Sequence, residues 1–166
     1  MADSSQNITQ ALLASRETAL PVTLTLGEQV LEIQTLLRFM PARRAVYAGA
    51  LDGKPVIIKL FSSHSRSRRE VQVEQERLAA LAEKQVPAPR VLLRDYPGDA
   101  ALLVLEHLGE MSAKSRLWEI TAEEIPDLVQ ELVALTSNMH RQGVVQNDIH
   151  LENFILTGQG WHGIDA

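Results

Sequence analysis

The sequence contains no cysteine, no long hydrophobic run and no excess of basic residues, and each absence excludes a class of protein. Without cysteine, neither disulfides nor thiolate metal sites can form, so a reducing compartment is the natural environment. No run of about 18 apolar residues occurs, so we expect no transmembrane helix. The first ten residues lack a basic segment followed by an apolar one, so no secretory signal is predicted.

The net charge of -5 argues against a general nucleic-acid-binding surface, which is normally basic. The 166 residues are 45% hydrophobic and 22% charged, which is ordinary for a globular chain that buries a core. Neither an internal repeat nor a low-complexity segment is visible. Residues 1–24 are polar and weakly patterned, and we interpret them as an N-terminal extension. A cytoplasmic protein without nucleic-acid partners is therefore expected.

Apolar periodicity and turn residues predict the first half of the fold. The spacing of Val30, Ile33 and Leu36 favours a short helix over residues 30–39, with a strand as the alternative. Asp52-Gly53 separates two apolar stretches and is typical of a two-residue hairpin turn, because both positions favour positive φ. Residues 45–51 and 54–61 are therefore predicted to be antiparallel strands.

The middle of the chain adds a helix and two more strands. A helix is predicted over residues 67–84, where two prolines follow and end it. Strands are predicted over 91–94 and 101–105, with a Pro-Gly-Asp turn between them. The order strand, strand, helix, strand, strand indicates a small antiparallel sheet with one helix packed on it.

The last third is predicted to be helical. Residues 109–124 are interpreted as a polar connector, and residues 127–142 as a helix that ends at Gly143. One face of this helix carries an apolar stripe: Leu128, Leu132, Leu135 and Met139. The chain thus reads as a sheet-rich part followed by the beginning of a helical part.

Lys59 and Glu74 are charged residues in apolar surroundings. Lys59 lies in a strand, where alternation alone would let it point to solvent. Glu74 continues the helical stripe of Val71 and Leu78, so its carboxylate is predicted to face the core. A buried carboxylate needs a cationic partner, and Lys59 is the candidate. Two alternatives stay open: Glu74 reaches water at the edge of the stripe, or Glu70 takes its role.

The stretch QNDIHLENFIL, residues 146–156, concentrates polar chemistry between apolar residues. Asp148 and Asn153 are five residues apart, and Asp165 follows twelve residues after Asn153. Oxygen ligands at the ends of short strands can bind Mg²⁺, and a further carboxylate can accept a proton from a hydroxyl nucleophile. A turn would explain one such residue. It does not explain this spacing together with the upstream lysine and glutamate.

The ordered set of a strand lysine, a helix glutamate, a D-x-x-x-x-N loop and a later aspartate resembles the signature of the protein-kinase-like superfamily. Within it, MPARR (residues 40–44), the KLF around the strand lysine and QNDIHLENF are most similar to bacterial lipopolysaccharide core sugar kinases, which act on heptose or Kdo. The resemblance covers about residues 30–166. It implies an α+β fold with an antiparallel-sheet N-lobe carrying one main helix, followed by the beginning of a helical C-lobe.

The resemblance also implies domain boundaries and cofactors. The N-lobe would span residues 25–108 with a hinge at 105–108, and the start of the C-lobe would span residues 109–166. The cofactors would be ATP and Mg²⁺.

Five residues would then carry the reaction. Lys59 would hold the α- and β-phosphates of ATP, with Glu74 orienting it. Asp148 would be the catalytic base that accepts the proton of the acceptor hydroxyl. Asn153 and Asp165 would bind Mg²⁺. Because phosphoryl transfer depends mainly on positioning and charge neutralisation, these residues could supply most of the machinery.

Further residues are given nucleotide-binding roles by the same resemblance. The backbone at Glu106 and Leu108 would face adenine. A glycine-rich loop is missing, and Arg43 and Arg44 either reach the phosphates in its place or face solvent. His150 either neutralises charge near the γ-phosphate or forms a structural hydrogen bond.

Three functions follow from the resemblance as alternatives. The first is transfer of the γ-phosphate to a hydroxyl of a lipopolysaccharide core sugar, with peripheral contact at the inner face of the inner membrane. The second is a protein Ser/Thr kinase, and the third a catalytically silent pseudokinase or nucleotide-binding module. Gln146-Asn147 replaces the usual His-Arg, so control by activation-loop phosphorylation is not expected.

The C-lobe of a complete kinase would extend beyond residue 166. We therefore expect a fragment with weak or no activity when isolated, and an apolar helix face left open for association.

Overall fold

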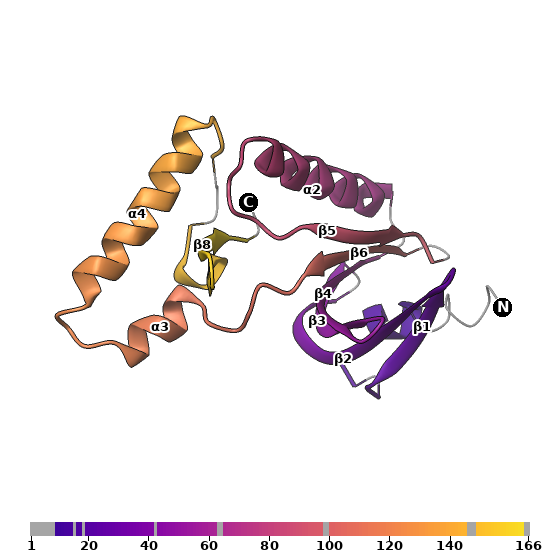
Figure 1. The fold of residues 1–166 in the computed structure, drawn as a ribbon. Coiled ribbons are helices and arrows are strands. Elements are labelled where there is room, and N and C mark those ends of the chain that lie inside the picture. Colours follow the sequence, from indigo (N-terminus) through magenta and orange to yellow (C-terminus); the bar gives the residue numbers. More distant parts are fainter. Residues whose placement is uncertain are drawn as a thin grey trace. The chain divides into compact units, whose positions relative to one another are not determined.

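The computed structural model describes residues 9–14, 16–17, 19–41, 43–62, 65–97, 100–145 and 149–164. The chain divides into unit 1, residues 1–75 and 91–107, and unit 2, residues 76–90 and 108–166. Figure 1 labels the elements: β1 (Val22–Leu26), β2 (Gln29–Met40), β3 (Arg44–Leu51), β4 (Lys54–Phe61), α2 (Ser65–Glu83), β5 (Val91–Asp95), β6 (Ala101–Glu106), α3 (Ala113–Glu119), α4 (Ile125–Arg141), η1 (Leu151–Asn153), β7 (Phe154–Thr157) and β8 (Gly160–Gly163).

Unit 1 is built on a six-stranded sheet in the order β1-β2-β3-β4-β6-β5, and every neighbouring pair is antiparallel. The predicted hairpin between β3 and β4 is confirmed, with Asp52 and Gly53 at φ 49° and 77°. The Asp52 carboxylate also accepts a hydrogen bond of 2.8 Å from the backbone of Val30. The antiparallel sheet and the helix α2 confirm the expected α+β class.

The helix favoured for residues 30–39 is wrong and the alternative, a strand, is confirmed, because this segment is β2. Leu31 and Ile33 are fully buried on one face of the sheet. The pairing of β2 with β3 shifts register between Ile33 and Thr35 and again between Leu36 and Arg38. The first irregularity adds a residue between Ile33 and Leu36, so both face the core at the helical step of three. Val30 does not share that face, because its side chain is 41% exposed.

The core of unit 1 includes residues that the sequence analysis assigned to an extension. Residues 9–14 are helical, and Leu12 is fully buried among the core side chains of the sheet. The buried hydroxyl of Tyr47, on β3, donates a hydrogen bond of 2.9 Å to the backbone carbonyl of Leu12. Burial raises the pKa of Tyr47. The boundaries at residues 24 and 108 remain predictions, but the chain before residue 24 contributes to this core.

Unit 2 contains α4, the β7–β8 hairpin and a helix that the sequence analysis missed. Residues 109–124 were expected to be a polar connector, and that expectation is wrong because α3 lies there. The hydroxyl of Ser112 accepts a hydrogen bond of 3.0 Å from the backbone of Ser115, which caps the first turn of α3. Trp118 of α3 is 82% exposed.

Most of the apolar stripe of α4 is buried, contrary to the expectation that it would lack packing partners, and Leu135 is partly buried. Leu128 and Leu132 form a core with Ala113, Phe154 and Trp161. The indole Nε1 of Trp161 donates a hydrogen bond of 2.7 Å to the Glu131 carboxylate, which links β8 to α4. Exposed apolar side chains on α4 belong to other positions: Ile125, Val129 and Val133.

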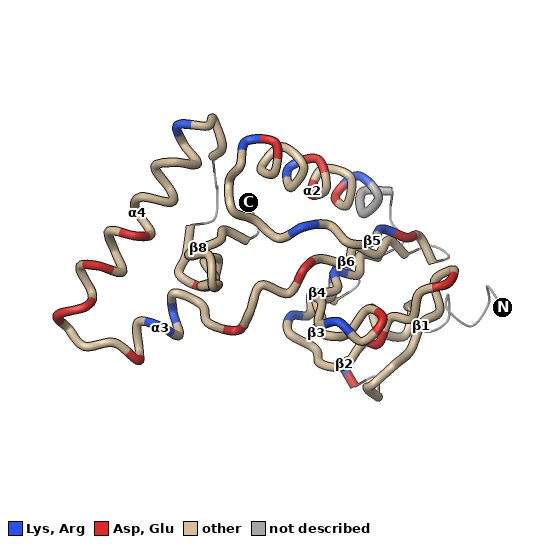
Figure 2. Tube along the Cα trace, in the orientation of Figure 1, with Lys and Arg blue, Asp and Glu red and all other residues tan. Residues whose placement is uncertain are grey.

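On α4, acidic residues lie toward the first turn and a basic residue lies in the last turn (Figure 2). Asp127 lies in the first turn, and His140 and Arg141 lie in the last. This placement matches the helix dipole, which favours acids at the start and bases at the end. Just before the helix, hydrogen bonds from the backbone and hydroxyl of Thr121 lower the pKa of Glu124. Within the described ranges, no helix is both long and apolar enough to cross a membrane.

Candidate functional site

The central contact of unit 1 is an ion pair between Lys59 of β4 and Glu74 of α2. The two side chains are only 7% and 18% exposed. Lys59 alternates with Ile58 and Leu60, which belong to the sheet core, so its side chain leaves the opposite face of the strand. The structure therefore shows the pairing predicted from the helical stripe.

Because little of either side chain is exposed, each charge needs the other to offset its loss of contact with water. Removing an ammonium or a carboxylate group from water costs several kcal/mol, which only a close opposite charge offsets. Lys59 and Glu74 supply that charge to each other. The arrangement holds a cation at a fixed place on β4, which is what binding of a phosphate group requires.

Glu70, the alternative partner of Lys59, has a different contact. It lies one turn before Glu74 on α2 and forms an ion pair of 3.5 Å with the guanidinium of Arg43. The Arg43 side chain is 60% exposed. The first turns of α2 thus contact two cations, Lys59 through Glu74 and Arg43 through Glu70.

Arg43 and Arg44 lie at the turn between β2 and β3, where the sequence has no glycine. The backbone N–H of Arg43 donates a hydrogen bond of 3.1 Å to the carbonyl of Met40, which closes the turn. The guanidinium carbon of Arg44 lies 6.0 Å from the centre of the Phe61 ring. Each arginine side chain therefore has a contact inside unit 1, Arg43 with Glu70 and Arg44 with Phe61.

The predicted adenine-facing residues lie where one unit passes into the other. Glu106 is the last residue of β6, and its neighbour on β4 is Val56. Unit 1 ends at His107, and Leu108 begins the second stretch of unit 2. The hinge at residues 105–108 and its contact with adenine remain predictions.

The loop around Asp148 is described only in part. Residues 146–148, and with them the predicted base Asp148, lie outside the described residues. His150 is exposed, and its backbone carbonyl accepts a hydrogen bond of 2.9 Å from the backbone N–H of Asn153, the last residue of η1. The charge-neutralising and structural roles of the His150 side chain remain alternatives.

Asn153 is buried, with 4% of its surface exposed, at the point where η1 meets β7. Its backbone carbonyl accepts a hydrogen bond of 2.8 Å from Ile164, the residue before Asp165. In the β7–β8 hairpin, Phe154 pairs with Gly163. The hairpin thus holds the backbone of Asn153 next to that of Ile164. Asp165 itself lies outside the described residues.

Three His, Asp or Glu side chains that could together hold a metal ion are not found among the described residues. Asp165, one of the two predicted ligands, and the predicted base Asp148 both lie outside those residues. The predicted ligands, the amide oxygen of Asn153 and the carboxylate of Asp165, are hard donors that suit Mg²⁺. The donor chemistry therefore fits the ion that the sequence predicts.

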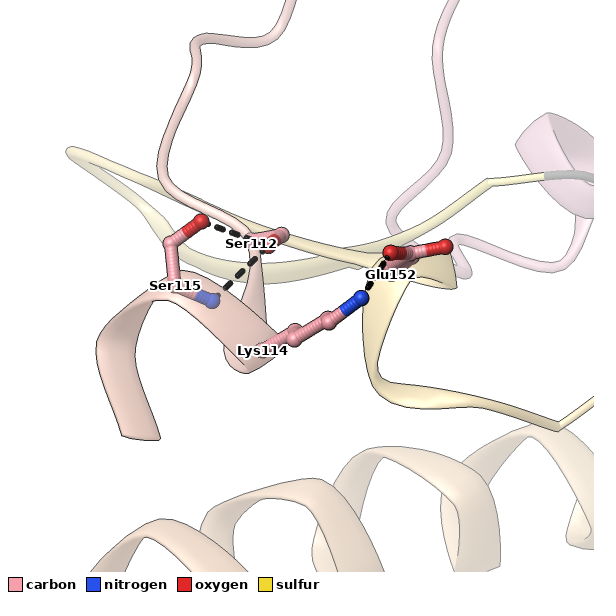
Figure 3. A network of polar contacts seen from close by, with 4 residues as sticks. All are labelled: Ser112, Lys114, Ser115 and Glu152. Atoms are coloured by element: carbon pink, nitrogen blue, oxygen red, sulfur yellow. Dashed lines mark hydrogen bonds and ion pairs between the residues drawn. The ribbon is translucent and has the colours of Figure 1, made fainter. Parts of the chain in front are cut away.

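A polar network joins α3 to η1, the element that follows the loop (Figure 3). The ammonium of Lys114 lies 2.6 Å from the Glu152 carboxylate, and both side chains are more than half exposed. Leu156 donates a backbone hydrogen bond of 2.8 Å to Met111, which ties β7 to the segment before α3. Sequence reasoning missed this contact. Ser112 was the available signal for α3, because serine is among the preferred N-cap residues of helices.

Comparison with known proteins identifies a family. The sequence model of a family described as Phosphotransferase enzyme family (APH) matches residues 42–144. CBL-interacting protein kinase 16 of Oryza sativa subsp. japonica is 31% identical over 113 residues, which are 65% of this chain and 25% of the rice protein. The chain therefore spans about a quarter of that relative's length.

Solved structures show the same fold at low identity. Vaccinia related kinase 3 matches 95% of this chain and 54% of its own, with a TM-score of 0.59 and 15% identity. A single-site mutant of the PknI kinase domain of Mycobacterium tuberculosis matches 89% of this chain and 62% of its own, with a TM-score of 0.57 and 18% identity. These likenesses establish a kinase-like fold for the chain.

Proposed function

Because the chain belongs to the phosphotransferase enzyme family, we propose that it is an ATP-dependent kinase that transfers the γ-phosphoryl group to a hydroxyl. The observation that carries the proposal is the ion pair between Lys59 and Glu74, which keeps a cation at low exposure on a sheet strand. A lysine held in this way by a helix glutamate is the element with which protein kinases bind the α- and β-phosphates of ATP.

The chemical step needs few protein groups. The acceptor oxygen forms a bond to the γ-phosphorus while the bond from that phosphorus to the bridging oxygen breaks, and ADP leaves. Asp148 accepts the proton of the acceptor hydroxyl. Asn153 and Asp165 would hold Mg²⁺, whose charge neutralises the phosphate oxygens when it is bound.

A lipopolysaccharide core sugar is the acceptor that we propose first. The segments MPARR and QNDIHLENF support it through their resemblance to kinases of that class. Such an acceptor would bring the protein into peripheral contact with the inner face of the inner membrane. The similarity to a rice protein kinase favours a second acceptor, a protein Ser or Thr hydroxyl.

Transfer of label from γ-labelled ATP tests the proposal. The full-length protein is incubated with Mg²⁺ and either dephosphorylated core oligosaccharide or a mixture of protein substrates. Asp148→Ala should lower transfer by about 10²- to 10⁴-fold, because the general base is lost. Glu123→Ala, which removes an exposed carboxylate of unit 2, is the matched control and should transfer normally. Equal transfer by the wild type and Asp148→Ala would refute the mechanism, and the labelled acceptor identifies the substrate class.

A further inference from the structure

Residues 9–26, which precede β2 in the chain and include β1, are here called the N-terminal arm. Leu12 is fully buried in the core of unit 1, and its carbonyl accepts the hydrogen bond from Tyr47. At the other end of the arm, β1 pairs with β2 from Val22 to Leu26. The arm is therefore attached to unit 1 through Leu12 and through β1.

Arg16, in the middle of the arm, contacts Phe39 in two ways. Its Nη2 donates a hydrogen bond of 3.5 Å to the Phe39 carbonyl, and its guanidinium carbon lies 5.4 Å from the centre of the Phe39 ring. Phe39 packs against the core of unit 1 and is the next-to-last residue of β2. Arg16 thus contacts both the backbone and the side chain of β2 immediately before the strand ends.

After β2 come Arg43 and Arg44, the arginines for which contact with phosphate is predicted. Arg43 closes the turn onto Met40, and Glu70 of α2 contacts its side chain. Arg44 lies against Phe61. Contacts from the arm, from α2 and from β4 therefore meet around this one short turn.

We propose that the N-terminal arm is a positioning element for nucleotide binding, in which Arg16 holds the end of β2 so that Arg43 and Arg44 face the phosphates of ATP. This inference rests on the proposed kinase function. A glycine-rich loop binds phosphate through its backbone, whereas a guanidinium binds it through two parallel hydrogen bonds whose direction depends on the position of the chain. A turn that relies on arginines therefore needs its backbone fixed. The exposed ion pair of Arg43 with Glu70 is weak enough for a phosphate to replace the carboxylate.

Affinity for a fluorescent ATP analogue with Mg²⁺ tests the inference in the full chain. Arg16→Ala should weaken binding by about two- to fivefold, the factor that one exposed cation–π contact is worth. Arg38→Ala is the matched control, because Arg38 is an exposed arginine adjacent to Phe39 in β2 and its loss changes the net charge equally. It should bind the analogue as tightly as the wild type.

A second control separates positioning from stability. Ile33→Val removes one buried methyl group from β2 and should lower the unfolding temperature without changing affinity measured well below that temperature. Hydrogen exchange of the Arg43 amide, without nucleotide, should be faster in Arg16→Ala than in Arg38→Ala.

The possible results separate a failure of the proposed role of the arm from a failure of the proposed kinase function. If the wild type binds the analogue and Arg16→Ala binds as tightly as Arg38→Ala, the role of the arm is refuted and the kinase proposal stands. Equal weakening in Arg16→Ala and Ile33→Val would also refute it, because any loosening of the sheet would then suffice. Failure of the wild type to bind the analogue refutes both.

Discussion

Lys59 in unit 1 and Lys114 in unit 2 each pair with a glutamate, but the two pairs lie in opposite environments. The side chains of Lys59 and Glu74 are 7% and 18% exposed, whereas those of Lys114 and Glu152 are 56% and 57% exposed. Water screens the second pair and competes for it, so its net contribution is small. Burial makes the first pair hard to break once it is formed.

The two units hold their predicted functional groups in place in different ways. Unit 1 fixes a side chain, Lys59, by enclosing its charge with a partner. Unit 2 fixes backbone instead: hydrogen bonds from Asn153 to His150, from Ile164 to Asn153 and from Leu156 to Met111 define the path of the chain. Substitutions of charged residues should therefore affect the two units very differently.

The largest effect is expected for Glu74→Ala, which leaves the ammonium of Lys59 nearly buried without the Glu74 carboxylate. Unfolding in urea, followed by far-UV circular dichroism, should show a loss of about 3 kcal/mol. Glu70→Ala removes the same charge one turn earlier, where the contact is more exposed, and should cost less than about 1 kcal/mol. The double variant Lys59→Met, Glu74→Leu should recover most of the stability. If Glu74→Ala and Glu70→Ala lost equal amounts of unfolding free energy, the buried pair would not stabilise unit 1 more than the exposed pair does.

An intermediate effect is expected for Tyr47→Phe, which removes the buried hydrogen bond to Leu12 and should cost about 1 kcal/mol at neutral pH. Because burial raises the pKa of Tyr47, the folded state keeps the hydroxyl protonated after the unfolded chain begins to ionise. The stability of the wild type is therefore complete below pH about 10 and falls as the pH rises toward the folded pKa.

Urea unfolding of the wild type and Tyr47→Phe between pH 7 and strongly alkaline pH measures this difference. The free energies of unfolding should converge above pH about 10, because the variant lacks the ionising group. A constant difference across this range would show that the environment of Tyr47 does not oppose ionisation.

The smallest effect is expected for Lys114→Ala, which breaks the exposed pair with Glu152 and should cost less than about 0.5 kcal/mol. Added salt should reduce even that cost. Ser112→Ala, in the same network, should cost about 1 kcal/mol because it removes the cap of α3. A loss for Lys114→Ala larger than that for Ser112→Ala would show that the surface pair stabilises unit 2 more than the backbone contacts do.

Local rules were enough to predict the pairing in unit 1. Glu74 shares a stripe with Val71, which is fully buried, and helical periodicity depends only on neighbouring residues. The cost of burying a carboxylate then identified Lys59 as the partner. In the same way, Asp52-Gly53 predicted the hairpin, because the required backbone conformation is a property of those two residues.

Features set by distant contacts could not be predicted. The irregular pairing of β2 with β3 hid a strand behind helical spacing at residues 30–39. Residues 9–14 are too few to show a period, so nothing local indicated that Leu12 is buried. The roles of Asp148 and Asp165 remain predictions, since both lie outside the described residues.

The aromatic residues are divided between the units in a way that has a practical consequence. Both tryptophans, Trp118 and Trp161, lie in unit 2, and both tyrosines, Tyr47 and Tyr96, lie in unit 1. Trp118 is 82% exposed and Trp161 is 8% exposed, so replacing Trp118 with phenylalanine would leave one enclosed indole as a fluorophore. Its emission would then report on unit 2, while near-ultraviolet tyrosine signals report on unit 1. Each unit thus has its own type of aromatic chromophore, tyrosine in unit 1 and tryptophan in unit 2.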